Sequence, residues 1–283
     1  MIKQNNLITI PADVAPELYQ TYLNNYLVAT KSSGKLMLVG GDHEGEYKQT
    51  NTDPEFMFRV AKKANIGVFS TLPEHLLYYG MDYKELPYVI RLSNNADTQT
   101  NNNQISTLVR FKKENNVNIV GIRYKITFGK QDELSMIQEA AKAVKQAHQY
   151  GLLAIIWGEF EQKSLQNMTQ QQLFVHAAQV ATFVKADFLK ISYTKQIEER
   201  DFQEAMQYTG RTKIVFAGGE MTEAKTFLTT VHKQLHTFHA SGTATGRNIE
   251  NRSFDEAVRL CNAVSAMTFD NTSLQNALAI YQK

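Results

Sequence analysis

The sequence predicts a (β/α)8 barrel, and three observations support this fold class. Short apolar runs alternate with segments of helical pattern along the 283-residue chain. The apolar runs are continuous, which is typical of parallel strands that are covered on both faces. Eight such units in roughly 250 residues match the size of this barrel. An open doubly wound sheet is the alternative, but no G-x-G-x-x-G turn follows the first expected strand.

The first half of the chain supplies four expected strands, each an apolar run. They span residues 35–42, 66–70, 88–92 and 118–124. A helix is expected to begin at Asp53, because aspartate is a good cap and Pro54 suits the first helical turn. A second helix is expected over 73–79. The polar segment 93–104 is rich in Asn and Thr and predicts a long loop after strand three, either mobile or acting as a lid.

The second half supplies the clearest helix and four more strands. Over 132–150, Met136, Ala140 and Val144 recur at helical spacing, and Gly151 ends the pattern. Further helices are expected over 170–184, 222–233 and 254–267, and strands over 152–157, 186–190, 213–217 and 237–241. Because no linker is evident, we expect a single domain over residues 1–283, with an N-terminal extension of about residues 1–33.

Composition argues against several classes of protein. The formal net charge is +2 with acids and bases interspersed, so neither nucleic acid nor a membrane is an expected partner. We find no apolar run of membrane length and no signal segment. The single cysteine, Cys261, rules out an internal disulfide and suits a reducing compartment. We therefore expect a cytoplasmic protein.

Lys190 is the first candidate catalytic residue. It closes an apolar run that begins at Ala186, so we expect it at the end of a buried strand. Apolar surroundings disfavour an ammonium ion, so the pKa of such a lysine falls and its neutral amine can attack a carbonyl. This is the requirement for Schiff-base catalysis. The alternative is a solvated lysine at a strand end.

Further candidates follow from the place of active sites in this fold, at the carboxyl ends of the strands. Asp42 follows strand one, Lys125 follows strand four, and Trp157 and Glu159 lie at the end of strand five. Glu159 is a candidate acid and base, because a carboxyl group in a cleft can exchange protons with a substrate. Asp42 could orient a substrate hydroxyl or assist proton transfer. Both carboxylates could instead be ordinary loop residues.

Two glycine-rich turns follow strands seven and eight. The first contains Gly218 and Gly219, and the second contains Gly246 and Arg247. Barrels often bind phosphate at these two loops, where bare backbone N–H groups and a short helix start contact the anion. Arg247 could add a bidentate contact. We expect a phosphate site here, with tight turns that bind nothing as the alternative.

Metal and hydrolase chemistry have little support in the sequence. The seven histidines are scattered, and the one cysteine lies in a helical pattern. The sequence contains neither a serine nucleophile elbow nor a cysteine at a helix start. We therefore expect neither a metal nor a cofactor.

Four segments carry a resemblance to a known family: 36–42, 66–71, 211–219 and 240–249, the last being the most specific. From about Gly34 to its C-terminus, the chain resembles the archaeal-type class I fructose-bisphosphate aldolases. The resemblance implies a (β/α)8 barrel that forms an imine with a sugar ketone without a metal, and a homo-oligomer that acts in glycolysis and gluconeogenesis. By position it implies a Schiff-base role for Lys190, active-site roles for Asp42 and Trp157, and phosphate binding by Gly218, Gly219, Gly246 and Arg247.

Three positions depart from the family pattern. The family usually follows the tryptophan with Tyr-Pro-Arg-Gly, whereas this chain has Glu159 at the tyrosine position and Glu161 at the arginine position. Glu220 replaces a serine after the double glycine. A nearby carboxylate repels a phosphate dianion, and Lys125, which is unexpected at its position, could compensate for the added acids.

The main functional expectation is a lysine-dependent aldolase acting on a sugar phosphate. Its reaction would be the cleavage of fructose 1,6-bisphosphate to dihydroxyacetone phosphate and glyceraldehyde 3-phosphate. One alternative is a related aldolase with a different sugar or carbonyl substrate. The other is a degenerate barrel that binds a sugar phosphate or a partner protein without chemistry.

Overall fold

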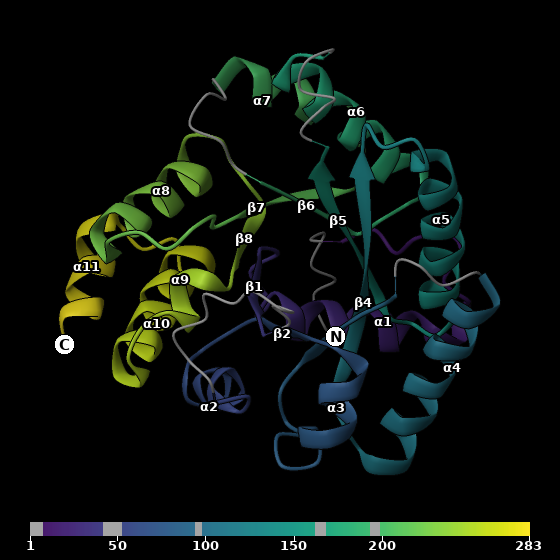
Figure 1. Cartoon of the computed structure of the whole chain (residues 1–283), viewed down its shortest axis with the longest axis horizontal. Helices are drawn as coiled ribbons and strands as arrows, with labels where there is room; N and C mark the ends of the chain where they lie inside the picture. The colour runs from purple at the N-terminus through teal and green to yellow at the C-terminus, as the bar shows by residue number, and fades with distance from the viewer. Residues whose placement is uncertain (1–7, 42–52, 94–97, 162–167, 193–198) are drawn as a thin grey trace, which may run out of the picture.

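Eight parallel strands close into a barrel in a computed structural model of the chain (Figure 1). The structure describes residues 8–41, 53–93, 98–161, 168–192 and 199–283. The strands follow one another around the barrel in chain order, and β8 pairs with β1 to close it. The predicted (β/α)8 fold class is therefore confirmed. The expected single domain, residues 1–283, stays a prediction.

The barrel wall is made of six short strands and two longer ones, β4 and β5. The strands are β1 (Leu36–Gly40), β2 (Val68–Thr71), β3 (Tyr88–Arg91), β4 (Ile119–Phe128), β5 (Leu153–Phe160), β6 (Phe188–Ser192), β7 (Lys213–Ala217) and β8 (Gly242–Thr245). The sequence predicts β4 and β5 three or four residues too short at their carboxyl ends. Their extensions pair with each other as far as Phe128 and Phe160, and this places Lys125 and Glu159 within strands rather than after them.

Helices surround the barrel (Figure 1). A short 3-10 helix, η1 (Pro16–Leu18), precedes the α-helices of the described residues: α1 (Tyr19–Ala29), α2 (Phe56–Lys63), α3 (Pro73–Tyr79), α4 (Thr98–Asn115), α5 (Glu133–Gln149), α6 (Gln170–Phe183), α7 (Glu199–Met206), α8 (Ala224–His236), α9 (Arg247–Glu250), α10 (Phe254–Phe269) and α11 (Leu274–Gln282). Within this part of the chain, no helix is both long and apolar enough to cross a membrane.

The strands divide the core into two layers, because successive side chains point to opposite faces of a strand. Met37 and Val39 belong to the larger cluster, which lies between the barrel wall and the helices. Leu38, Val89 and Phe188 belong to a smaller cluster that fills the barrel interior. The buried Cys261 of α10 belongs to the larger cluster, as its helical sequence pattern predicts.

The amino-terminal end of the barrel is closed by α1 and the segment before it. Tyr22 and Tyr26 of α1 are buried against the interior cluster, and the Tyr26 ring stacks on Phe188 with ring centroids 6.1 Å apart. Asn25 donates a hydrogen bond to the carbonyl of Gly151 at 2.7 Å. The described part of the N-terminal extension is therefore packed into the fold.

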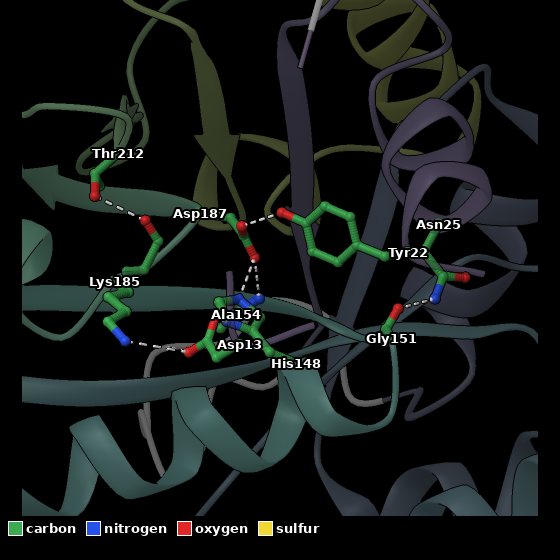
Figure 2. Close-up of polar contacts among 10 residues, drawn as sticks. Asp13, Tyr22, Asn25, His148, Gly151, Ala154, Lys185, Asp187 and Thr212 are labelled. Carbon is green, nitrogen blue, oxygen red and sulfur yellow. Dashed lines mark hydrogen bonds and ion pairs between the residues drawn. The ribbon is translucent and has the colours of Figure 1, made fainter. Parts of the chain in front are cut away.

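A buried histidine joins this segment to the barrel. Figure 2 shows His148 of α5 between two carboxylates, with Nδ1 2.9 Å from Asp13 and Nε2 3.2 Å from Asp187. The other oxygen of Asp187 accepts a hydrogen bond from the hydroxyl of Tyr22. Burial alone would lower the pKa of His148, but its hydrogen bonds and charge interactions with the two carboxylates raise that pKa to about 9. A protonated histidine therefore holds the two carboxylates together.

The sequence prediction for strand eight is wrong. Residues 237–241 follow the end of α8 instead, where the N–H of Phe238 donates to the carbonyl of Lys233 at 3.2 Å and His239 has a φ of 52°. The strand itself is Gly242–Thr245, whose small residues give little apolar signal although all four are buried. Gly246 and Arg247 still follow a strand end.

The loop expected over 93–104 is wrong for most of its length, since α4 begins at Thr98. Asn101, Ile105 and Leu108 are buried, and their spacing of four and three residues marks one helical face. The many Asn and Thr residues hide this pattern because their intrinsic helix propensity is weak. Packing of the helix overrides that preference, so most of the segment is not a lid.

Candidate active site

Lys190 lies in the middle of β6 with its side chain in the barrel interior, whereas the sequence predicts it at the end of the strand. Its neighbours Leu189 and Ile191 face the outer cluster, which leaves Lys190 on the inner face. Its backbone is in register with Trp157 of β5 on one side and Val215 of β7 on the other. The residue is 6% exposed, and its Nζ atom lies 3.5 Å from the centroid of the Trp157 ring. The predicted burial of this lysine is confirmed.

The surroundings of Lys190 favour its neutral amine. Burial lowers the pKa of Lys190 well below its usual value, because an ammonium ion loses its hydration there. The carboxylate of Glu159 acts in the opposite direction, whereas the cationic groups of Arg123, Arg247 and Lys125 lower the pKa further. The amine is therefore better prepared for attack on a carbonyl than a surface lysine would be.

Trp157 has two cations over its ring, one from each neighbouring strand. Lys190 approaches from β6, and the guanidinium carbon of Arg123 on β4 lies 4.1 Å from the ring centroid. Aromatic faces attract cations, and the attraction is larger where water is excluded. The structure therefore brings Trp157 to Lys190, as the sequence predicts, and adds a contact that the sequence did not suggest.

Lys125 and Glu159 form an ion pair at the extended ends of β4 and β5. The Nζ atom of Lys125 is 2.7 Å from Oε2 of Glu159. Both side chains are partly exposed, at 29% and 41%, so this pair lies at the mouth of the barrel. Because Trp157 and Glu159 are two positions apart on β5, both face the interior side of the strand. Lys125 and Glu159, both predicted site residues, thus lie together near Lys190.

Arg123 is the member of this group that sequence reasoning missed. It lies two positions before Lys125 on β4, is 4% exposed, and its Nε–H donates to Oγ of Ser70 on β2 at 3.0 Å. Burial lowers its pKa to about 9, while the charge of Glu159 opposes that shift. A signal was present: arginine is almost never buried without a polar partner, and Arg123 stands inside an apolar strand.

The predicted phosphate loops are joined by Asn248 of α9. This buried side chain donates to the backbone carbonyl of Glu220 at 2.9 Å and accepts from the N–H of Thr222 at 3.1 Å. Arg247 forms an ion pair with Glu220 across the same two loops. The arginine expected to bind phosphate is therefore paired with one of the carboxylates that depart from the family pattern.

The two glycines after β7 differ in what they offer a ligand. The N–H of Gly218 donates to the carbonyl of Ala244 at 2.7 Å, so this donor extends the sheet and is not bare. A Cβ atom at Gly218 would lie 2.9 Å from the Phe227 ring, which explains the glycine by packing. Gly219 has a φ of 72° and open space around it, which suits a turn that a ligand can approach.

Two further predictions concern Asp42 and metal ions. Asp42 lies outside the described residues. Among the residues that are described, no group of three or more His, Cys, Asp or Glu side chains could hold a metal ion.

A buried lysine with a lowered pKa, on a strand of a closed barrel, is a feature that can be compared with known proteins. The sequence pattern of the DeoC/LacD family aldolases matches residues 36–252, more than half of the chain. The chain belongs to this aldolase family. It is therefore a lyase that acts on carbon–carbon bonds.

The aldolase is similar to curated relatives from archaea. It is 34% identical to the fructose-bisphosphate aldolase/6-deoxy-5-ketofructose 1-phosphate synthase of Methanocaldococcus jannaschii, over 97% of this chain and 94% of the relative. It is 25% identical to a class 1 fructose-bisphosphate aldolase of Thermoproteus tenax, over 87% of this chain and 94% of the relative.

The aldolase is also similar to solved structures. A fructose-bisphosphate aldolase from Slackia heliotrinireducens superposes with a TM-score of 0.87 at 31% identity, covering 97% of this chain and 94% of that one. An archaeal fructose 1,6-bisphosphate aldolase superposes with a TM-score of 0.67 at 20% identity, covering 88% and 99%. The second likeness shows a shared fold.

Proposed function

We propose that this aldolase uses Lys190 as a Schiff-base nucleophile to cleave and form a keto-sugar phosphate. The observation that carries the proposal is the Lys190 amine, buried 3.5 Å from the Trp157 ring with a pKa well below its usual value. Fructose 1,6-bisphosphate is the proposed substrate, because relatives that match most of this chain are named for it.

The proposed reaction proceeds through a covalent imine between Lys190 and the substrate ketone. Nζ of Lys190 attacks the ketone carbon C2, and the carbinolamine takes up a proton and loses water to leave a protonated imine. A base takes the proton of the C4 hydroxyl, and the C3–C4 electron pair moves into the imine. Glyceraldehyde 3-phosphate leaves, and the enamine remains on the lysine. Protonation at C3 and hydrolysis of the imine release dihydroxyacetone phosphate and restore the amine.

Glu159 is the proposed proton carrier of this sequence. Its ion pair with Lys125 holds its carboxylate at the barrel mouth, on the same strand face as Trp157. A general base must reach the proton that it abstracts, and general acid–base catalysis contributes typically about 10²–10⁴-fold in rate. We further propose that Asp42 assists by orienting a substrate hydroxyl.

The phosphate of the substrate is proposed to bind at the loops after β7 and β8. Gly219, Gly246 and Arg247 lie at this end of the barrel, and Asn248 holds the two loops together. Gly218 would contribute close packing rather than its N–H, since that donor is engaged. Arg247 can bind a phosphate only if its pairing with Glu220 is exchanged or shared.

The remaining parts of the proposal follow the resemblance to archaeal-type class I aldolases. We propose a homo-oligomer in the cytoplasm that acts in glycolysis and gluconeogenesis and needs no cofactor. The single, buried Cys261 is consistent with a reducing compartment.

A second candidate is a related lysine-dependent aldolase whose substrate carries less negative charge. The pairing of Glu220 with Arg247 favours it, because a phosphate dianion at this position must compete with a carboxylate already there. A keto-sugar monophosphate or an unphosphorylated carbonyl compound would avoid that competition at one end of the molecule.

A substrate panel tests the proposal. The protein would be assayed for cleavage of fructose 1,6-bisphosphate, tagatose 1,6-bisphosphate, fructose 1-phosphate and fructose. Turnover that disappears in Lys190→Met and persists in Lys112→Met, a lysine of the outer helix α4, supports Schiff-base cleavage. Preference for fructose 1-phosphate would favour the second candidate. Turnover that survives Lys190→Met would overturn both.

A further inference from the structure

Arg123 is a charged residue of the barrel interior to which the proposed reaction gives no task. It is 4% exposed, and it lies on β4, one strand away from the strand that carries Trp157 and two strands away from Lys190. Burial of a guanidinium is costly unless polar or aromatic contacts compensate it.

Two contacts among the described residues help to fix the position of the guanidinium. Nε of Arg123 donates to Oγ of Ser70 at 3.0 Å, and Ser70 is itself fully buried on β2. The guanidinium carbon lies 4.1 Å from the centroid of the Trp157 ring. A planar guanidinium stacks on an aromatic face in a way that an ammonium group cannot reproduce. The contacts therefore span β2, β4 and β5.

The same indole ring is the surface against which the Lys190 amine lies. Nζ of Lys190 is 3.5 Å from the ring centroid, so any movement of the ring changes a surface that this amine contacts. We infer that Arg123 is a positioning residue: its guanidinium, anchored by Ser70, holds the Trp157 ring in place for the Lys190 amine. The inference rests on the proposed function of Lys190.

The charge of Arg123 gives this position a second effect. Several charged groups of the described residues face the Lys190 amine: Glu159 on β5, Arg123 and Lys125 on β4, and Arg247 on α9. Only Glu159 among these four stabilises the ammonium form, while the three cations oppose it. Arg123 is the most deeply buried of the three cations, so its charge is the least screened by water.

Two readouts separate this role from a merely structural one. The first is the pH midpoint at which Lys190 reacts with isotopically labelled formaldehyde and cyanoborohydride, read by peptide mass against the exposed Lys63. Formaldehyde reacts with the neutral amine, so the midpoint follows the ionisation of Lys190. The second is acrylamide quenching of tryptophan fluorescence, which reports on Trp157 alone because the chain has one tryptophan.

Three variants and one control are compared. Arg123→Met removes both the positive charge and the stacking contact with Trp157. Loss of the charge should raise the midpoint by about one pH unit, and loss of the contact should increase quenching about twofold. Arg123→Lys keeps the charge and loses the planar contact, so quenching should increase while the midpoint stays within about 0.3 units. Ser70→Ala removes only the hydrogen bond that anchors Arg123, so its quenching and midpoint should resemble those of Arg123→Lys. Lys112→Met removes a cation outside the barrel and should change neither readout.

The result that overturns the inference is an Arg123→Met protein with wild-type quenching, whatever its midpoint and its melting temperature. If Arg123→Met does not fold, wild-type quenching in both Arg123→Lys and Ser70→Ala overturns it. Failure of the proposed function is recognised separately, because it would appear as no substrate-derived adduct on wild-type Lys190. The formaldehyde midpoints could still be measured in that case.

Discussion

The Nζ atom of Lys125 lies 2.7 Å from Oε2 of Glu159, across the extended ends of β4 and β5. This pair occupies the barrel mouth, and the resemblance to archaeal-type class I aldolases implies a tyrosine where this chain has Glu159. A carboxylate can carry a proton as a tyrosine can, provided that it is held within reach of the substrate. The ion pair with Lys125 supplies that positioning.

Replacing Glu159 by Gln should therefore lower kcat by about 10²–10⁴-fold, because the amide cannot exchange a proton. Formation of the imine on Lys190 should persist, since the amine and the Trp157 ring are untouched. Steady-state kinetics with borohydride trapping measures both quantities. Glu139→Gln on α5, a half-buried carboxylate outside the barrel that pairs with Lys142, is the control and should keep kcat. A wild-type kcat in Glu159→Gln would remove the carboxylate from the mechanism.

Replacing Glu220 by Gln should strengthen phosphate binding, because Arg247 then loses the carboxylate that competes for it. Glu220 is 78% exposed, so the gain is limited to the energy of a surface ion pair, up to about fivefold. The inhibition constant of inorganic phosphate measures it. Glu223→Gln, which removes a carboxylate at the N-cap of α8, is the control. Unchanged or weaker inhibition in Glu220→Gln would place the phosphate site elsewhere.

Replacing Lys190 by Met should abolish activity and stabilise the fold at neutral pH. The native pKa of Lys190 is lowered, so the unfolded chain binds a proton that the native protein holds poorly. Between that lowered pKa and the unfolded value near 10.5, wild-type stability rises with pH. The advantage of Lys190→Met should therefore shrink as pH rises toward 10.5. Urea unfolding at several pH values measures it, and an advantage that grows with pH would contradict a lowered pKa.

Replacing His148 by Gln should destabilise the protein in a pH-dependent way. The native pKa is raised from 6.5 to about 9, so the stabilisation is fully present below pH 6.5 and is lost as pH rises through 9. This pKa shift contributes on the order of 3 kcal/mol to the free energy of unfolding at pH 6. Urea unfolding of wild type and variant at pH 6 and pH 10 measures the difference. Asp13→Asn, which removes one of the two carboxylate partners, should show a smaller loss in the same pH window. An equal loss at pH 6 and pH 10 would contradict a protonated His148.

The fold and the burial of Lys190 could be predicted from the sequence because both depend on local pattern. Apolar runs of strand length mark the barrel wall, and a lysine in such a run marks a buried amine, although β6 continues past Lys190 to Ser192. Strand eight was misplaced because Gly242–Thr245 lacks large apolar residues, and its burial comes from closure of the barrel. The helix at Thr98 was missed because polar residues of weak propensity cover its packed face.

The contacts of the site could not be predicted, because they join residues far apart in the chain. The stacking of Arg123 on Trp157 and its bond to Ser70 depend on the register of neighbouring strands. The pairing of Glu220 with Arg247 depends on loops that follow different strands. A cation within an apolar strand, such as Arg123, is the local sign that should prompt a search for such contacts.

The central claim is that the Lys190 amine forms an imine with the substrate, and reductive trapping measures this directly. The protein would be incubated with dihydroxyacetone phosphate, reduced with borohydride, and digested for peptide mass analysis. A substrate-derived mass increase is expected on the peptide that contains Lys190, and none is expected in Lys190→Arg. A protein without that increase, or with the adduct on Lys125 instead, would contradict it.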